Sequence, residues 1–93
     1  KDAELLAERS SAYGKLRQYQ KAVDDANAAL AINPNLIFAY YCRGAGYARL
    51  HQIDKTVADC KKITELTPTD ERGHRLRGDS FALLNLYPQA FEE

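Results

Sequence analysis

The sequence predicts an all-α protein, a right-handed α-solenoid in which helix-turn-helix hairpins stack side by side. Apolar residues recur at three- and four-residue spacing through most of the chain, which is typical of amphipathic helices. Pro34 and Pro68 stand 34 residues apart, each two places after an apolar residue. Shifting the chain by 34 residues also aligns residues of the same class, and a period of this length indicates stacked helical repeats.

The aligned positions indicate how the helices pack. A small residue recurs, an aromatic follows three places later, and a leucine three places after that. A small residue lets two helices approach closely, so each unit is expected to be a helix pair, with alanine-type positions supplying the partner surface. The aligned sets are Ser10, Gly44 and Gly78; Tyr13, Tyr47 and Phe81; Leu16, Leu50 and Leu84; Tyr19, Ile53 and Tyr87; Ala22, Thr56 and Ala90; Ala29 and Ile63; Ile32 and Leu66; and Pro34 and Pro68.

The period divides the chain, residues 1–93, into about two and a half units with five to six helices. The first unit covers residues 3–35, the second 36–70 and the partial third 71–93. In the second unit we expect helices over 37–50 and 54–65. Pro34 and Pro68 separate the units, because a proline inside a helix removes a hydrogen bond and clashes with the preceding turn. Pro88 suits the first turn of a sixth helix, where an amide hydrogen is not needed.

Two sets of motifs carry a family resemblance. The segment "RGAGYARL" is followed by "TVADC" and "LTP", and "RSSAYGKL" is followed by "YQKAVDDA" and "INP". These motifs resemble the tetratricopeptide repeat, over almost the whole chain. The departures are Leu6 and His74 at a position that is usually a large aromatic, Thr56 at a usual alanine, and Ala26 or Cys60 at an often aromatic position. The resemblance implies a binding module that holds a protein or peptide in a groove lined by the first helix of each pair, without catalytic chemistry.

The composition excludes several other classes. Thirteen Lys and Arg balance thirteen Asp and Glu, so the excess positive charge of a nucleic-acid binder is absent. No apolar run approaches the roughly 18 residues that cross a membrane, so membrane insertion is not expected. Cys42 and Cys60 lack the spacing of a disulfide framework or zinc site, which favours a reducing, cytoplasmic location. Because the chain lacks a first methionine and ends within a repeated pattern, we expect it to be a fragment.

The candidate partner-binding residues are those that the period does not require. On the helix expected over 37–50 they lie opposite the repeated stripe, and their equivalents in the other units differ in class. We predict that a partner contacts Phe38, Tyr41, Cys42, Arg49, Arg72 and Arg75. The groove would then be acidic at Glu4 and Glu8 and apolar at Phe38 and Tyr41, with the arginines supplying positive charge.

Alternatives remain open for these residues. Phe38 and Tyr41 could pack against the sixth helix or a further one, and the arginines could be solvated. A self-associating structural segment is a second function, in which Phe81, Leu84 and Phe91 pair with another copy. Some tetratricopeptide co-chaperones clamp a terminal carboxylate. The equivalent positions here are Ala7, Ser11, Cys42, Arg72 and Leu76, and only Arg72 is cationic, so a co-chaperone-like role without that clamp is expected.

No catalytic, metal or cofactor site is expected. His51 lies in a predicted turn and His74 on a packing stripe, so the two histidines lack the spacing of metal ligands. Cys42 is interpreted as a small apolar residue, since no histidine is placed near it. The "RGAG" glycines at 43–46 lie inside a helix and lack the strand that precedes a phosphate loop. Asp24, Asp25 and Asp59 fall on second helices, where we expect them to face solvent.

Overall fold

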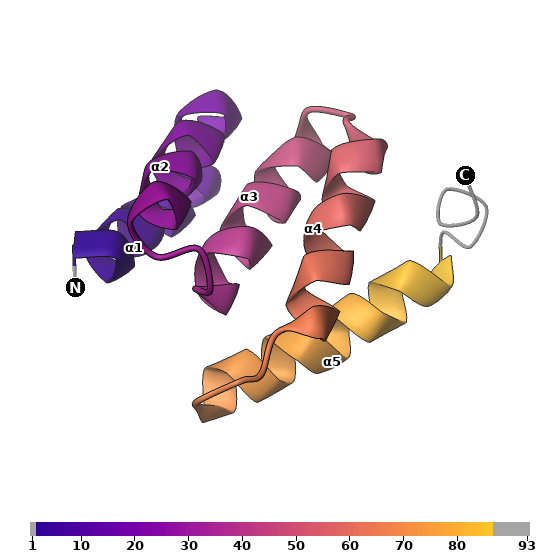
Figure 1. Cartoon of the computed structure of the whole chain (residues 1–93). Helices are drawn as coiled ribbons and strands as arrows, with labels where there is room; N and C mark the ends of the chain where they lie inside the picture. The colour runs from indigo at the N-terminus through magenta and orange to yellow at the C-terminus, as the bar shows by residue number, and fades with distance from the viewer. Residues whose placement is uncertain (1, 87–93) are drawn as a thin grey trace.

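Five α-helices form the described part of the chain, residues 2–86, in the computed structural model (Figure 1). They are α1 (Asp2–Lys15), α2 (Tyr19–Ile32), α3 (Ile37–Arg49), α4 (Ile53–Glu65) and α5 (Glu71–Leu86). The two helices expected over 37–50 and 54–65 are confirmed to within one residue at each end. The sixth helix expected at Pro88 lies outside the described residues.

The helices pack as sequential pairs. α1 packs against α2 and α3 against α4, while α2 contacts α3 and α4 contacts α5. α3 and α4 run antiparallel and are joined by a short turn at the top of Figure 1. α3 also contacts both α1 and α5, so the first helices of the successive units lie side by side. This arrangement confirms the all-helical prediction of stacked hairpins.

Each hairpin is closed by one hydroxyl at the small-residue position. In the first, Ser10 Oγ donates to the Ala22 carbonyl at 2.6 Å. In the second, Thr56 Oγ1 donates to the Gly44 carbonyl at 3.0 Å. The two contacts stand at equivalent places of the 34-residue period, but the hydroxyl comes from opposite helices. Thr56 therefore keeps the hairpin contact although it replaces an alanine.

The glycine positions differ in what surrounds them. A Cβ at Gly44 would lie 3.3 Å from Asp59 Cβ, so this glycine is wedged against α4 as predicted. A Cβ at Gly46 would lie 2.8 Å from Val23 Cγ2, closer than real side chains approach. Gly46 therefore permits α3 to lie against α2. A Cβ at Gly78 would meet no described atom within 4 Å other than those of its own helix backbone. Ala90, the expected partner of Gly78, lies outside the described residues.

The core joins all five described helices. Its main cluster contains Ala3, Ala7, Ala29, Leu30, Ile37, Ala39, Tyr40, Ile63 and Leu76, and a second cluster contains Val57, Cys60 and Leu84. The predicted apolar columns are only partly buried. Leu84 is buried, whereas Leu16, its equivalent in the first unit, is 64% exposed. Leu16, one residue beyond the end of α1, therefore does not share the burial of its equivalent Leu84.

Both turns within the hairpins have the same backbone form. Arg17 and His51 adopt positive φ values of 64° and 65° and stand 34 residues apart. The next residue donates its amide back into the helix, from Gln18 to Tyr13 and from Gln52 to Tyr47, which is how a left-handed residue ends a helix. The turn position predicted for His51 is confirmed.

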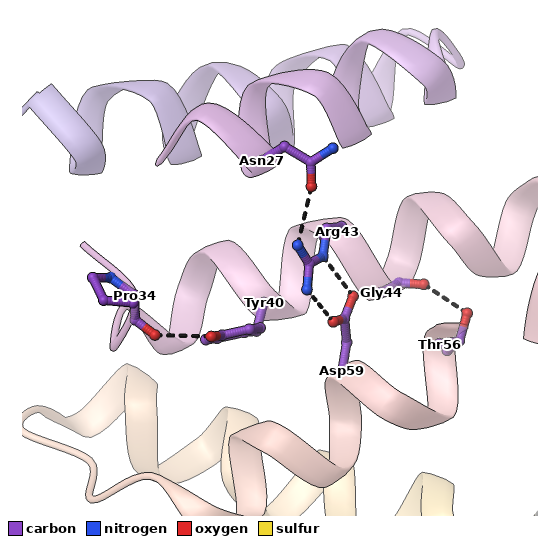
Figure 2. A network of polar contacts seen from close by, with 7 residues as sticks. All are labelled: Asn27, Pro34, Tyr40, Arg43, Gly44, Thr56 and Asp59. Atoms are coloured by element: carbon purple, nitrogen blue, oxygen red, sulfur yellow. Dashed lines mark hydrogen bonds and ion pairs between the residues drawn. The ribbon is translucent and has the colours of Figure 1, made fainter. Parts of the chain in front are cut away.

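Between the first two units, Pro34 occupies the connection as expected. α2 ends at Ile32 and α3 begins at Ile37. The Tyr40 hydroxyl donates to the Pro34 carbonyl at 2.8 Å, as Figure 2 shows. Tyr40 is the large aromatic at the position where the other units have Leu6 and His74. His74 is exposed, so its predicted place on a packing stripe is wrong.

Two carboxylates expected to face solvent are buried. Arg9 Nε donates to Asp25 Oδ2 at 2.7 Å, and Arg43 donates to both oxygens of Asp59, at 3.0 and 2.6 Å. The prediction for Asp25 and Asp59 was wrong because arginines 16 residues earlier in each unit pair with them; Asp24 is exposed as expected. Figure 2 shows that Arg43 also donates to Asn27 of α2, so it links three helices.

The aromatic column lies beneath cations. The Arg9 guanidinium carbon and the Lys21 Nζ are 5.9 and 5.7 Å from the centre of the Tyr13 ring. Arg43 and Lys55 lie over the Tyr47 ring in the same way, at 5.9 and 5.3 Å. These distances are in the range of cation–π attraction. These cation–π contacts of Tyr13 and Tyr47 therefore stabilise the two hairpins at their surface.

Gly46→Ala is expected to destabilise the protein by about 1 kcal/mol. Overpacking against Val23 costs roughly 1–3 kcal/mol, and the better helix propensity of alanine offsets about 1 kcal/mol of that. Urea unfolding followed by circular dichroism measures the change. Gly14→Ala is the control, since nothing lies within 4 Å of its Cβ position. An equal or greater stability of Gly46→Ala would contradict a close α2–α3 contact.

Arg43→Met is expected to cost about 3–5 kcal/mol at neutral pH, because it leaves the Asp59 carboxylate buried without its partner. Burial raises the pKa of Asp59, and Arg43 opposes that rise. Without Arg43 the pKa rises further above its unfolded value, so the folded state binds the proton more tightly and the deficit shrinks as the pH falls.

Unfolding free energies at pH 7 and pH 4 test this expectation. Arg9→Met should cost less, because the Arg9 side chain is 60% exposed and that of Arg43 is 23% exposed. A deficit of Arg43→Met that does not change with pH would show that Asp59 is not the group left unpaired.

Candidate functional site

Two cavities of about 570 Å³ each lie between the first helices of the units. The first, named here the basic cavity, is bounded by α1, the α1–α2 turn, the start of α2 and α3; its lining includes Lys15, Arg17, Tyr19, Tyr41, Cys42 and Arg49. The second, named the acidic cavity, is bounded by α1, the start of α3, the end of α4, α5 and the connections before α3 and α5. Its lining includes Glu4, Asn35, Glu65, Thr67, Asp70 and Arg72. Phe38 lines both. Together the two cavities form the candidate groove.

Phe38 and Arg72 form one contact across the candidate groove. The Arg72 guanidinium carbon lies 3.7 Å from the centre of the Phe38 ring. Arg72 NH1 also donates to Glu8 Oε2 at 3.2 Å. Glu8, Phe38 and Arg72 belong to α1, α3 and α5, so this contact joins the three first helices. Phe38 thus packs against α5, and Arg72 already has a carboxylate partner.

Tyr41 and Arg49 are directed to the basic cavity. Tyr41 is 40% exposed, which leaves much of its ring available. Arg49 is exposed and lies with its guanidinium carbon 6.0 Å from the centre of the Tyr19 ring. The structure therefore brings Phe38, Tyr41 and Arg49 together in the lining of the basic cavity.

Two further cations in this cavity were not among the predicted site residues. Lys15 and Arg17 are exposed and line the basic cavity beside Arg49. Lys15 could have been found, because it is the equivalent of Arg49 one period earlier. Arg17 could not, because it lies in a turn and its place depends on the left-handed backbone there.

Cys42 forms part of the wall of the basic cavity, and its thiol is unreactive near neutral pH. Its residue is buried, and its thiol donates to the Ala7 carbonyl at 3.7 Å. Burial raises the pKa of Cys42 to about 12, so the thiolate nucleophile is not populated near neutral pH. Burial also raises the pKa of the Cys60 thiol.

Arg75 is exposed on α5 and lines neither cavity. Among residues 2–86, no group of three or more His, Cys, Asp or Glu side chains could hold a metal ion. No helix within the same range is long and apolar enough to cross a membrane.

Comparison with known proteins agrees with this architecture. Residues 3–36 match the family described as the tetratricopeptide repeat. The SGT1 homolog of Oryza sativa subsp. japonica is 46% identical over 43 residues, which cover 46% of this chain and 12% of that protein. No solved structure matches the chain. Residues 3–36 are thus a tetratricopeptide repeat, and the five described helices pack as the sequential pairs expected of such hairpins.

We expect both cysteines to resist thiol reagents in the folded protein, because their thiols are buried and protonated. A disulfide reagent such as dithionitrobenzoate at pH 8 should react slowly in buffer and rapidly in concentrated urea. Cys42→Ala should leave the slow native reaction unchanged. Rapid modification of Cys42 without denaturant would contradict its assignment as an inert part of the wall.

Proposed function

We propose that this chain is a protein-interaction module that holds an extended or helical segment of a partner protein in the candidate groove. The observation that supports the proposal is the pair of adjoining cavities that share Phe38. Exposed aromatic and charged side chains line them, although the 34-residue period does not require such residues there. Pockets of several hundred Å³ with a few directed polar groups are typical of binding sites.

In this proposal, Tyr41 and Phe38 supply the apolar contact and Arg49 a charge-assisted hydrogen bond. Aromatic and arginine side chains account for much of the binding energy in protein interfaces. Arg72 holds Phe38 in place through its stacking contact, and Cys42 closes the wall. Arg75 lies outside both cavities, so in this proposal it contacts only a part of the partner that extends beyond them.

A grip on a terminal carboxylate is not part of this proposal. Two of the positions that such a clamp uses are occupied by Ala7 and Leu76, which are buried and apolar. We assign residues 36–70 and 71–93 to a second and a partial third repeat by the same period. We also propose a non-catalytic role in the cytoplasm, where the two buried cysteines would stay as free thiols.

Self-association is the second candidate. Phe81 is 47% exposed, which favours an interface on α5, but Leu84 is buried in the second core cluster and is not available. Phe91 lies outside the described residues. Light scattering over a range of protein concentrations tests this candidate, and a strict monomer at all concentrations would exclude it.

Panning a random peptide phage library against the protein tests the groove. We expect Tyr41→Ala to weaken the binding of selected peptides at least about ten-fold, as for a central aromatic contact. Phe81→Ala is the matched control, because its ring is similarly exposed and lines neither cavity; it should change the affinity less than about two-fold. Equal affinities for Tyr41→Ala and the unaltered chain would remove the groove assignment.

A further inference from the structure

We propose that the candidate groove selects a peptide segment whose charges are separated, with carboxylates at the end that enters the basic cavity and cations at the end that enters the acidic cavity. An apolar or aromatic residue between them would contact Phe38 and Tyr41. This inference rests on the proposed function and names the class of partner that the groove fits. Its basis is the distribution of charge between the two cavities.

The basic cavity has cations without matching acids. Lys15, Arg17 and Arg49 line it, and no Asp or Glu of the described chain does. Within residues 2–86, Lys15 and Arg17 take part in none of the ion pairs, which are Arg9–Asp25, Arg43–Asp59 and Arg72–Glu8. Arg49 only approaches the Tyr19 ring. These cations are therefore available to a carboxylate from outside.

Helix ends reduce this positive charge but do not cancel it. Lys15 and Arg49 lie in the last turns of α1 and α3, and the carboxyl end of a helix is equivalent to about half a negative charge. Two such ends offset about one of the three cations, and the amino end of α2 at the same cavity restores about half a charge. The cavity stays positive and attracts carboxylate side chains.

The acidic cavity has the opposite excess. Among the described residues, Glu4, Glu65 and Asp70 line it, and Arg72 is the one lining cation. Arg72 is already bound to Glu8 and stacked on Phe38. Asp70 accepts the Gly73 amide at 2.7 Å, which fixes the start of α5. Glu4 and Glu65 have no ion pair among the described residues, so they can accept a lysine or arginine of a ligand.

The spacing of the cavities sets the length of the ligand. Phe38 stands in the first turn of α3 and Arg49 in its last, which places them about 16 Å apart along the helix. An extended peptide covers that distance with about five residues. A segment of about eight residues therefore reaches both cavities. A longer polyanion such as a nucleic acid would also meet Glu4 and Glu65, which repel it.

Two synthetic peptides of the same composition test the proposal. Each has about eight residues: three acidic, two central apolar including phenylalanine, and three lysines. In the first peptide the acids and lysines are grouped at opposite ends; in the second they alternate. Fluorescence anisotropy should give the grouped peptide at least about five-fold tighter binding in low salt, and this advantage should fall in 0.5 M salt because exposed charges are screened.

Variants assign the effect to the basic cavity. Lys15→Gln/Arg17→Gln should weaken the grouped peptide about five- to ten-fold, as expected for two partly exposed charge contacts. Lys62→Gln is the control, since Lys62 is exposed on α4 and lines neither cavity. Lys15→Glu/Arg17→Glu should instead prefer a peptide with lysines at both ends. Circular dichroism confirms that each variant is folded.

The outcomes separate this inference from the proposed function. Equal binding of the two peptides, with Tyr41→Ala still weakening both, would overturn the charge preference and leave the interaction module intact. Tighter binding of a single-stranded oligonucleotide than of the grouped peptide would also overturn it. If neither peptide binds, the charge preference is wrong. If the phage library also yields no binder that depends on Tyr41, the proposed function fails as well.

Discussion

The close approach of α3 to α2 at Gly46 is the constraint on which the rest of the structure depends. A side-chain carbon at Gly46 would lie 2.8 Å from Val23 Cγ2, so a larger residue would force the two hairpins to shift at this contact. The same contact helps to form the basic cavity, because Gly46 and Ala22 lie in its lining. Arg43 reinforces it by linking Asn27 of α2 to Asp59 of α4. The contact at Gly46 therefore determines both how the two hairpins pack and the shape of the basic cavity.

The fold could be predicted because its main features repeat. The close contacts at Ser10 and Gly44, the buried Ala29 and Ile63 and the prolines between units follow from one period. The same 34-residue period also relates the two ion pairs that the sequence reasoning missed. Arg9 and Arg43 are one period apart, and so are Asp25 and Asp59. Asp25 and Asp59 were expected to face solvent, whereas their pairing with arginines 16 residues earlier buries both carboxylates.

The candidate site was predictable only in part. Phe38, Tyr41 and Arg49 could be placed on one helix face from the helical period, and the structure brings them to one cavity. The helical period says nothing of neighbours from other units, so it could not show that Arg72 stacks on Phe38 and binds Glu8. Turn geometry was equally out of reach, which is why Arg17 was missed.

The contact between Val23 and Gly46 can be measured directly. In a nuclear Overhauser spectrum of the isotope-labelled protein, the account predicts a strong cross-peak between a Val23 γ-methyl group and a Gly46 α-hydrogen. Cross-peaks within the α1–α2 and α3–α4 hairpins serve as internal references. If those references are present and the Val23–Gly46 cross-peak is absent, the hairpins do not meet at this glycine, and the shared origin of stacking and cavity is contradicted.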